Sequence, residues 1–299
     1  MSVPPSYEHP GSPPRRPELP EGVWRPEPPP EPERADGLPR WPLWAPFAAM
    51  LATLFVAILG VGVIALLVEL AGGNISDGAG ESPGVTIAGT YLQDLALIGS
   101  AVVLARIVDR PVTPAKFGLR LPRLKPAIGW TLVAWFAFVV FTVAWSQALG
   151  ITENDDLPQE LGVDESNVAL VFVAILVCVL APIAEELFFR GFCFTALRRR
   201  LGMLPAAAAT GIIFGAIHLG GTEVEFVVPL MVFGFMLCLL YVWTKSIVPC
   251  IVLHALNNSL ALGVSQGWDA WTLFAMIASV IVVLAISLPL ARRSQAVVA

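Results

Sequence analysis

The stretch VALVFVAILVCVLAPIAEELFFRGFCFTALRRR, residues 168–200, decides the fold of this chain. An apolar run is followed within it by two glutamates, an arginine and a basic end. As a helix its 33 residues would reach about 50 Å, whereas the hydrocarbon core of a bilayer is about 30 Å thick. We therefore expect a transmembrane helix that tilts, bends or extends beyond the bilayer. Pro182 is the expected bend, because its ring excludes the helical hydrogen bond to Cys178.

The rest of the chain has the composition of a membrane protein. Of its 299 residues, 56% are hydrophobic and only 14% are charged, whereas soluble domains carry about 25% charged residues. An open strand edge does not survive in lipid, so the apolar segments are expected to be helices. The sequence predicts an all-α polytopic bundle of about eight transmembrane helices over residues 43–299. The eight segments are 44–70, 88–107, 127–149, 168–200, 204–219, 226–244, 247–264 and 270–290.

Basic residues occur in every second segment that connects the apolar runs. They occur in loop 108–126, at 198–200, at 245 and at 292–293, and they are missing from loops 71–87, 150–167, 220–225 and 265–269. Basic residues favour the cytoplasmic side. The pattern predicts a multi-pass protein of the cell membrane with both termini in the cytoplasm.

Residues 1–42 are expected to form a disordered cytoplasmic tail, because more than half of the 26 prolines lie there among charged residues. No short apolar segment with a cleavage site opens the chain, so we expect no cleavable signal peptide. The four cysteines lie in apolar runs without CxxC spacing, which predicts neither a disulfide framework nor a thiolate zinc site. No basic stripe is present, so nucleic acid is not an expected partner.

The motif EELFFR places Glu185, Glu186 and Arg190 inside the fourth segment. Each ionised group would cost about 2.5–3.5 kcal/mol at the middle of the bilayer. Glu186 and Arg190 are four residues apart, in the order that favours an ion pair on a helix. Glu185 lies about 100° further around the helix. We therefore expect Glu186 and Arg190 to hold structure and Glu185 to perform acid–base chemistry.

Two further motifs carry histidines within apolar segments. Phe214 and His218 share a helix face in FGAIH, and His254 and Asn258 share one in HALNN. From the cytoplasmic ends of their segments, Glu185 and His218 would lie about 20 Å deep and His254 about 12 Å deep. Another intramembrane acid, Asp94, is interpreted as a satisfied polar contact.

These residue types suit hydrolysis in two ways. Glu185 can deprotonate a water molecule while the imidazoles and the amide stabilise an oxyanion. Alternatively, Glu185, His218 and His254 can form a zinc site with an open position for water. A serine nucleophile is disfavoured because no GxSxG stretch occurs. A different class of function is a non-catalytic transporter or immunity-type peptide-binding protein that uses the same polar cluster.

The order EExxxR, FxxxH and HxxxN resembles the signature of the CPBP family of intramembrane proteases, over about residues 165–265. That family includes CAAX prenyl endopeptidases and Abi-type bacteriocin-processing or self-immunity proteins. The resemblance implies an intramembrane endopeptidase acting on a peptide or protein at the membrane, prenylated in one branch. It implies that Glu185 activates the water with help from His218, and that His254 and Asn258 stabilise the oxyanion. Glu186, Arg190 and Phe214 would support the site. Members are described both as metalloproteases, which would use zinc, and as glutamate-dependent enzymes.

Overall fold

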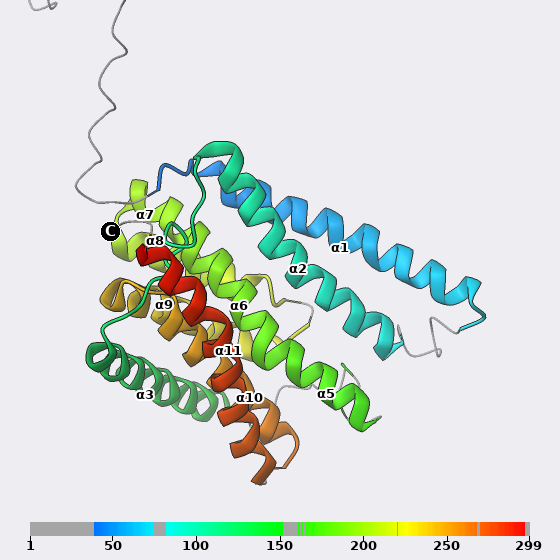
Figure 1. Ribbon diagram of the computed structural model, residues 1–299. Helices are drawn as coiled ribbons and strands as arrows, with labels where there is room; N and C mark the ends of the chain where they lie inside the picture. The colour runs from blue at the N-terminus through cyan, green and yellow to red at the C-terminus, as the bar shows by residue number, and fades with distance from the viewer. Residues whose placement is uncertain are drawn as a thin grey trace, which may run out of the picture. The chain divides into compact units, whose positions relative to one another are not determined.

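The computed structural model describes residues 39–73, 82–151, 161, 163, 166–219, 221–267 and 270–296. Almost all of the predicted tail, 1–42, lies outside this part of the chain. Within it the regular secondary structure is entirely helical (Figure 1). The helices are α1 Trp44–Leu70, α2 Pro83–Val108, α3 Leu124–Leu149, a continuous run Asn167–Leu201, α8 Met203–Ala216, α9 Val224–Thr244, α10 Val248–Ser265 and α11 Ala270–Ala296.

Seven of these helices in the described part are long and apolar enough to cross a membrane. The eighth, α8, has 14 residues and spans about 21 Å, less than the hydrocarbon core. The all-α polytopic fold is therefore confirmed. The fifth expected segment, 204–219, is a shorter helix than predicted, because the chain leaves the helix at Ala216 and turns.

The run Asn167–Leu201 changes its hydrogen-bond register along its length. Its parts are α5 Asn167–Ile175, the π-helix η1 Leu176–Leu180, α6 Ala181–Glu186, the π-helix η2 Leu187–Phe194 and α7 Thr195–Leu201. At the end of η1 the Ala181 N–H donates to the Leu176 carbonyl, five residues back. In this register the Val177 carbonyl would need the nitrogen of Pro182, which carries no hydrogen. The irregularity expected at Pro182 thus takes the form of a π-helical stretch that leaves one carbonyl without a helical partner.

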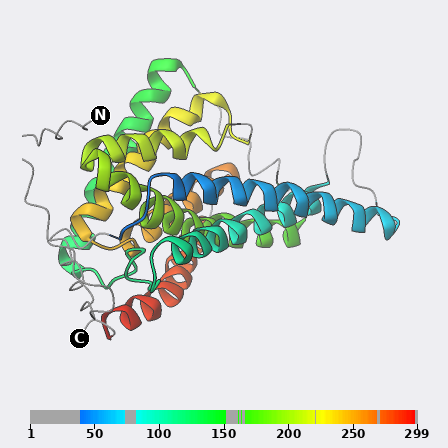
Figure 2. The ribbon, with the colours of Figure 1, turned by 90° about the horizontal axis from the view of Figure 1, so that it is seen from above.

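Three antiparallel helix pairs surround this run (Figures 1 and 2). They are α1 with α2, α8 with α9, and α10 with α11, while α3 packs on α9. The α6 segment contacts both α2 and α10. The two glutamates of the EELFFR motif, on α6, therefore lie in the interior of the bundle and not on its lipid-facing surface.

Small residues bring α8 and α9 together. Gly211 and Gly215 lie one turn apart on α8, and a Cβ atom at Gly211 would lie 2.5 Å from the carbonyl oxygen of Met231. On the facing side, a Cβ atom at Gly234 would lie 2.9 Å from Cβ of Phe214. The two backbones touch, as at small-residue crossings of transmembrane helices. This crossing presses Phe214 against α9.

Trp41 packs in the core although it falls within the predicted tail. Its side chain is 1% exposed, and its ring lies 4.9 Å from Phe117 and 4.8 Å from Phe192, between centroids. Aromatic pairs at such distances add packing energy beyond the area that they bury. The packed part of the chain therefore begins before residue 43.

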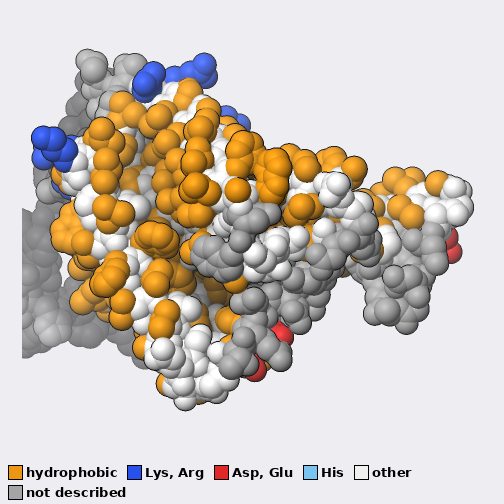
Figure 3. Space-filling view, turned by 90° about the horizontal axis from the view of Figure 1, so that it is seen from below, with side chains coloured by type: hydrophobic (Ala, Val, Ile, Leu, Met, Phe, Trp, Pro, Cys, Tyr) orange, Lys and Arg blue, Asp and Glu red, His pale blue; other side chains and the backbone are white. Residues whose placement is uncertain are grey.

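Charge is distributed unevenly over the surface of the bundle (Figure 3). Lys and Arg side chains lie at one end of an extensive apolar surface, and carboxylates lie away from them. We call the end that carries the residues 198–200, 245 and 292–293 the basic end, and the end that carries the turn 217–223 and the helix ends Leu149 and Ser265 the opposite end. The apolar surface between them matches a lipid-facing band.

Candidate active site

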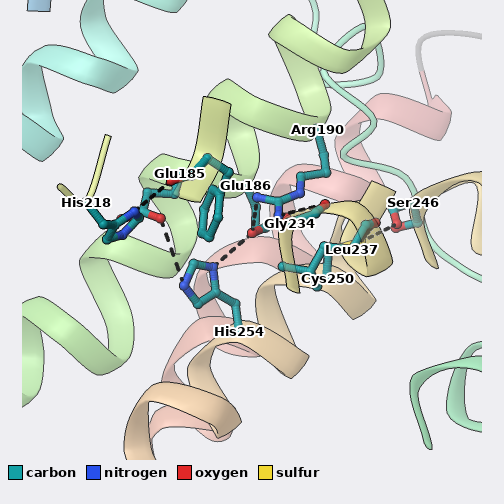
Figure 4. Close-up of polar contacts among 10 residues, drawn as sticks. Glu185, Glu186, Arg190, His218, Gly234, Leu237, Ser246, Cys250 and His254 are labelled. Carbon is teal, nitrogen blue, oxygen red and sulfur yellow. Dashed lines mark hydrogen bonds and ion pairs between the residues drawn. The ribbon is translucent and has the colours of Figure 1, made fainter. Parts of the chain in front are cut away.

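The Glu186–Arg190 ion pair forms the fixed part of the site (Figure 4). Nη1 of Arg190 donates to Oε1 of Glu186 at 2.7 Å, and Nη2 donates to the carbonyl of Gly234 at 3.3 Å. Both side chains are fully buried. The guanidinium carbon lies 4.6 Å from the centre of the Phe214 ring, a cation–π distance. The charges are thus paired with each other and with groups on α8 and α9.

His254, on α10, is oriented by Glu186. Its Nδ1 lies 2.9 Å from Oε1 of Glu186, and since a carboxylate accepts, Nδ1 is the donor. The ring stands edge-on to Phe214 and Phe233, at 5.8 Å and 5.4 Å between centroids. Nε2 is consequently the ring nitrogen that is free to interact within the cavity. It lies 3.9 Å from Oε2 of Glu185, beyond direct hydrogen-bond distance.

His218 lies in the turn that follows α8. Its Nδ1 is 2.7 Å from the carbonyl oxygen of Phe214, one of the last carbonyls of a helix, which have no helical donor. A carbonyl only accepts, so Nδ1 carries the hydrogen and Nε2 of the neutral ring can accept a proton. The Phe214 ring lies 5.1 Å away between centroids, which accounts for the pairing of these residues in the sequence.

Glu185 lies between the two imidazoles (Figure 4). Its side chain is 13% exposed, and its Oε2 is buried without a hydrogen-bond partner among the described residues. Together with His218 and His254 it lines a cavity of about 340 Å³. The different depths expected for Glu185 and His254 do not separate them, because α6 and α10 pack directly against each other. The structure therefore brings the predicted carboxylate and both imidazoles to one cavity.

Asn258 also lines the cavity, but one of its bonds is structural. Its Nδ2 donates to the Val177 carbonyl at 2.9 Å, the carbonyl that η1 and Pro182 leave without a helical donor. An amide has two N–H groups, so one remains for other partners. Sequence spacing had no signal for this contact, because it depends on the π-helical register.

The described residues do not form a metal site. No three His, Cys, Asp or Glu side chains among them are grouped so that they could hold an ion. Nδ1 of His254 and Nδ1 of His218 are engaged by Glu186 and by the Phe214 carbonyl, which leaves Nε2 of each ring free, and all four cysteines are free and buried. The zinc alternative, with Glu185, His218 and His254 as ligands, is therefore not supported by a grouped set of ligands in the described part of the chain.

The interpretation of Asp94 as a satisfied polar contact is wrong. It is 4% exposed on α2, and its Oδ2 is buried without a hydrogen-bond partner in the described part of the chain, so it is not a satisfied polar contact. Its carboxyl group interacts electrostatically with Glu185. An acidic residue within a membrane segment is itself the signal that marks such a position.

Residues 167–260 match the family model described as Type II CAAX prenyl endopeptidase Rce1-like. No curated protein and no solved structure matches the chain. The matched segment begins at the start of α5, ends within α10, and contains all three motifs with the cavity residues Glu185, His218, His254 and Asn258. Through this segment, about a third of the chain, the protein is similar to the CPBP family of intramembrane proteases.

Proposed function

We propose that this protein is an intramembrane endopeptidase in which Glu185 activates the water that attacks the peptide bond. One observation supports this assignment above the others: the two adjacent glutamates have different surroundings. Oε1 of Glu186 accepts from Arg190 and from His254, whereas Glu185 lines the cavity and its Oε2 accepts no hydrogen bond from the described residues, with Nε2 of His254 at 3.9 Å. Glu185 is the carboxylate that is left to take a proton.

The proposed reaction needs no covalent intermediate. A water molecule in the cavity gives a proton to Glu185 while its oxygen bonds to the carbonyl carbon of the substrate. His218, whose Nε2 faces away from its bond with Phe214, assists as a second acceptor. The carbonyl oxygen becomes an oxyanion, and the proton held by Glu185 then passes to the leaving nitrogen as the C–N bond breaks.

His254 and Asn258 are the proposed oxyanion donors. With Nδ1 fixed on Glu186, His254 presents Nε2 to the cavity, where a protonated ring would donate. Asn258 offers its second amide hydrogen. Preorganised donors of this kind contribute about 2.7–4 kcal/mol each where single donors have been removed.

The test is proteolysis of quenched peptides, prenylated and unprenylated, by the purified full chain in detergent. Glu185→Gln is expected to abolish cleavage while its unfolding midpoint stays close to that of the wild type. Glu69→Gln is the matched control, because Glu69 is exposed at the end of α1, and it should cleave normally. A chelator added in parallel should leave cleavage unchanged. If wild type and Glu185→Gln bind peptide differently but neither cleaves, the protein is the transporter or peptide-binding protein instead.

A further inference from the structure

The cavity extends from the catalytic groups toward only one end of the bundle. Its walls include Val173, which precedes Glu185 by about three turns, Phe226 in the first turn of α9 and Val264 in the last turn of α10. Thr222, in the turn between α8 and α9, also lines it. All of these positions lie toward the opposite end, which has no Lys or Arg in its connecting segments.

Toward the basic end the site is closed by packed side chains. From Phe188 to Leu197 every residue of the long run is buried. Trp41, Leu237 and Ile247, which pack in the same region, are at most 1% exposed. The fully buried Glu186–Arg190 pair lies on this side of Glu185. A polypeptide arriving at the basic end would meet this core and not the cavity.

The distribution of charge relates these two ends to the membrane. Lys and Arg accumulate in cytoplasmic loops and at cytoplasmic helix ends. The closed, basic end is thus the cytoplasmic one, and the described residues that line the cavity extend from Glu185 toward the far side of the membrane.

We infer that the site receives its substrate from the extracytoplasmic side: an apolar polypeptide segment of an exported or membrane-anchored protein. The inference rests on the proposed function, because it assigns a substrate class to the same cavity. The apolar lining contributed by Val173, Phe226 and Val264 suits an extended segment with apolar side chains, whose scissile carbonyl would reach Glu185. A lipidated C-terminus presented in the cytoplasm would lie at the closed end.

The first arm of the test labels single introduced cysteines with a membrane-impermeant maleimide in intact and permeabilised cells that express the full chain. Val224→Cys is placed near the cavity mouth and Leu201→Cys at the basic end, where the native side chains are 72% and 46% exposed. The four native cysteines are buried and provide the unlabelled background. Val224→Cys should react in intact cells, and Leu201→Cys only after permeabilisation. The reverse pattern would overturn the inference.

The second arm connects the mouth to catalysis in the purified protein. A bulky maleimide on Thr222→Cys should block peptide cleavage relative to the same variant before labelling, whereas labelling Leu201→Cys should not. Cleavage that survives the label at Thr222→Cys would refute entry by this route and leave the protease intact. If labelling follows the expected sides but wild type and Glu185→Gln are equally inactive, the proposed function fails and the substrate assignment fails with it.

Discussion

Oε1 of Glu186 accepts two hydrogen bonds, from Nη1 of Arg190 at 2.7 Å and from Nδ1 of His254 at 2.9 Å. One carboxylate oxygen thus joins the continuous helical run Asn167–Leu201 to α10 and sets the orientation of the His254 imidazole. The arrangement separates the roles of two neighbouring residues of the same type. Glu186 holds the ion pair and the imidazole, and Glu185 lines the cavity.

Glu186→Gln should destabilise the protein far more than Glu185→Gln. The substitution leaves the Arg190 cation buried without its counter-charge, and breaking a buried pair costs about 3–5 kcal/mol. Denaturant titration of the purified protein in mixed micelles would measure the difference. Equal unfolding free energies for the two variants would contradict the central role of the ion pair.

Replacing both members of the pair should cost less than the sum of the single replacements. Glu186→Leu leaves the buried Arg190 cation without its counter-charge, and Arg190→Leu does the same to the Glu186 carboxylate. The double variant leaves neither charge of the pair behind. A double-mutant cycle of unfolding free energies is expected to give a coupling of about 0.5–3 kcal/mol. Additive effects would show that the two side chains are stabilised independently.

Asn258→Ala should lower both stability and activity. It leaves the Val177 carbonyl unpaired next to the π-helix, which costs about 1–3 kcal/mol, and it removes one proposed oxyanion donor. Asn257→Ala is the matched control, because the neighbouring amide also lines the cavity but does not bond to that carbonyl. If Asn257→Ala is as destabilising as Asn258→Ala, the bond to Val177 is not what matters.

Gly211→Val should separate α8 from α9. The added atoms would meet the Met231 carbonyl at 2.5 Å, and overpacking of this kind costs about 1–3 kcal/mol. Cleavage should fall as well, because α8 carries Phe214 and leads to His218. Gly129→Val is the control, since a Cβ atom there meets nothing within 4 Å. If Gly211→Val and Gly129→Val shift the unfolding midpoint equally, close contact between α8 and α9 at Gly211 is not what stabilises the protein.

Asp94→Asn should raise the unfolding free energy. It replaces a buried carboxyl group that has no partner at Oδ2 and lies near the Glu185 carboxyl with a neutral amide of the same shape, and an unpaired charge costs more to bury than a neutral polar group. Glu69→Gln, on an exposed side chain, should change stability little. A destabilised Asp94→Asn would reveal a partner contributed from outside the described residues.

Sequence reasoning located the helices because lipid requires long apolar runs, and α1 begins and ends at the predicted residues. It also anticipated the Glu186–Arg190 contact, which depends only on helical spacing. It could not place His218 in a turn beyond α8, because the end of a helix is hard to recognise in a sequence that stays apolar past it. The bond between Asn258 and Val177 was equally inaccessible, because it joins residues 81 positions apart through a local change of register.

The two π-helical stretches have a consequence for the faces of the long central helix. Each stretch accommodates residues in a wider turn, so the helix changes phase before and after the short α6 segment. One continuous helix can then present Glu185 to the cavity and, two turns later, Phe192 to Trp41. A helical wheel with a uniform period of 3.6 residues, drawn for residues 167–201, would therefore not show which face of the helix carries Glu185 into the cavity.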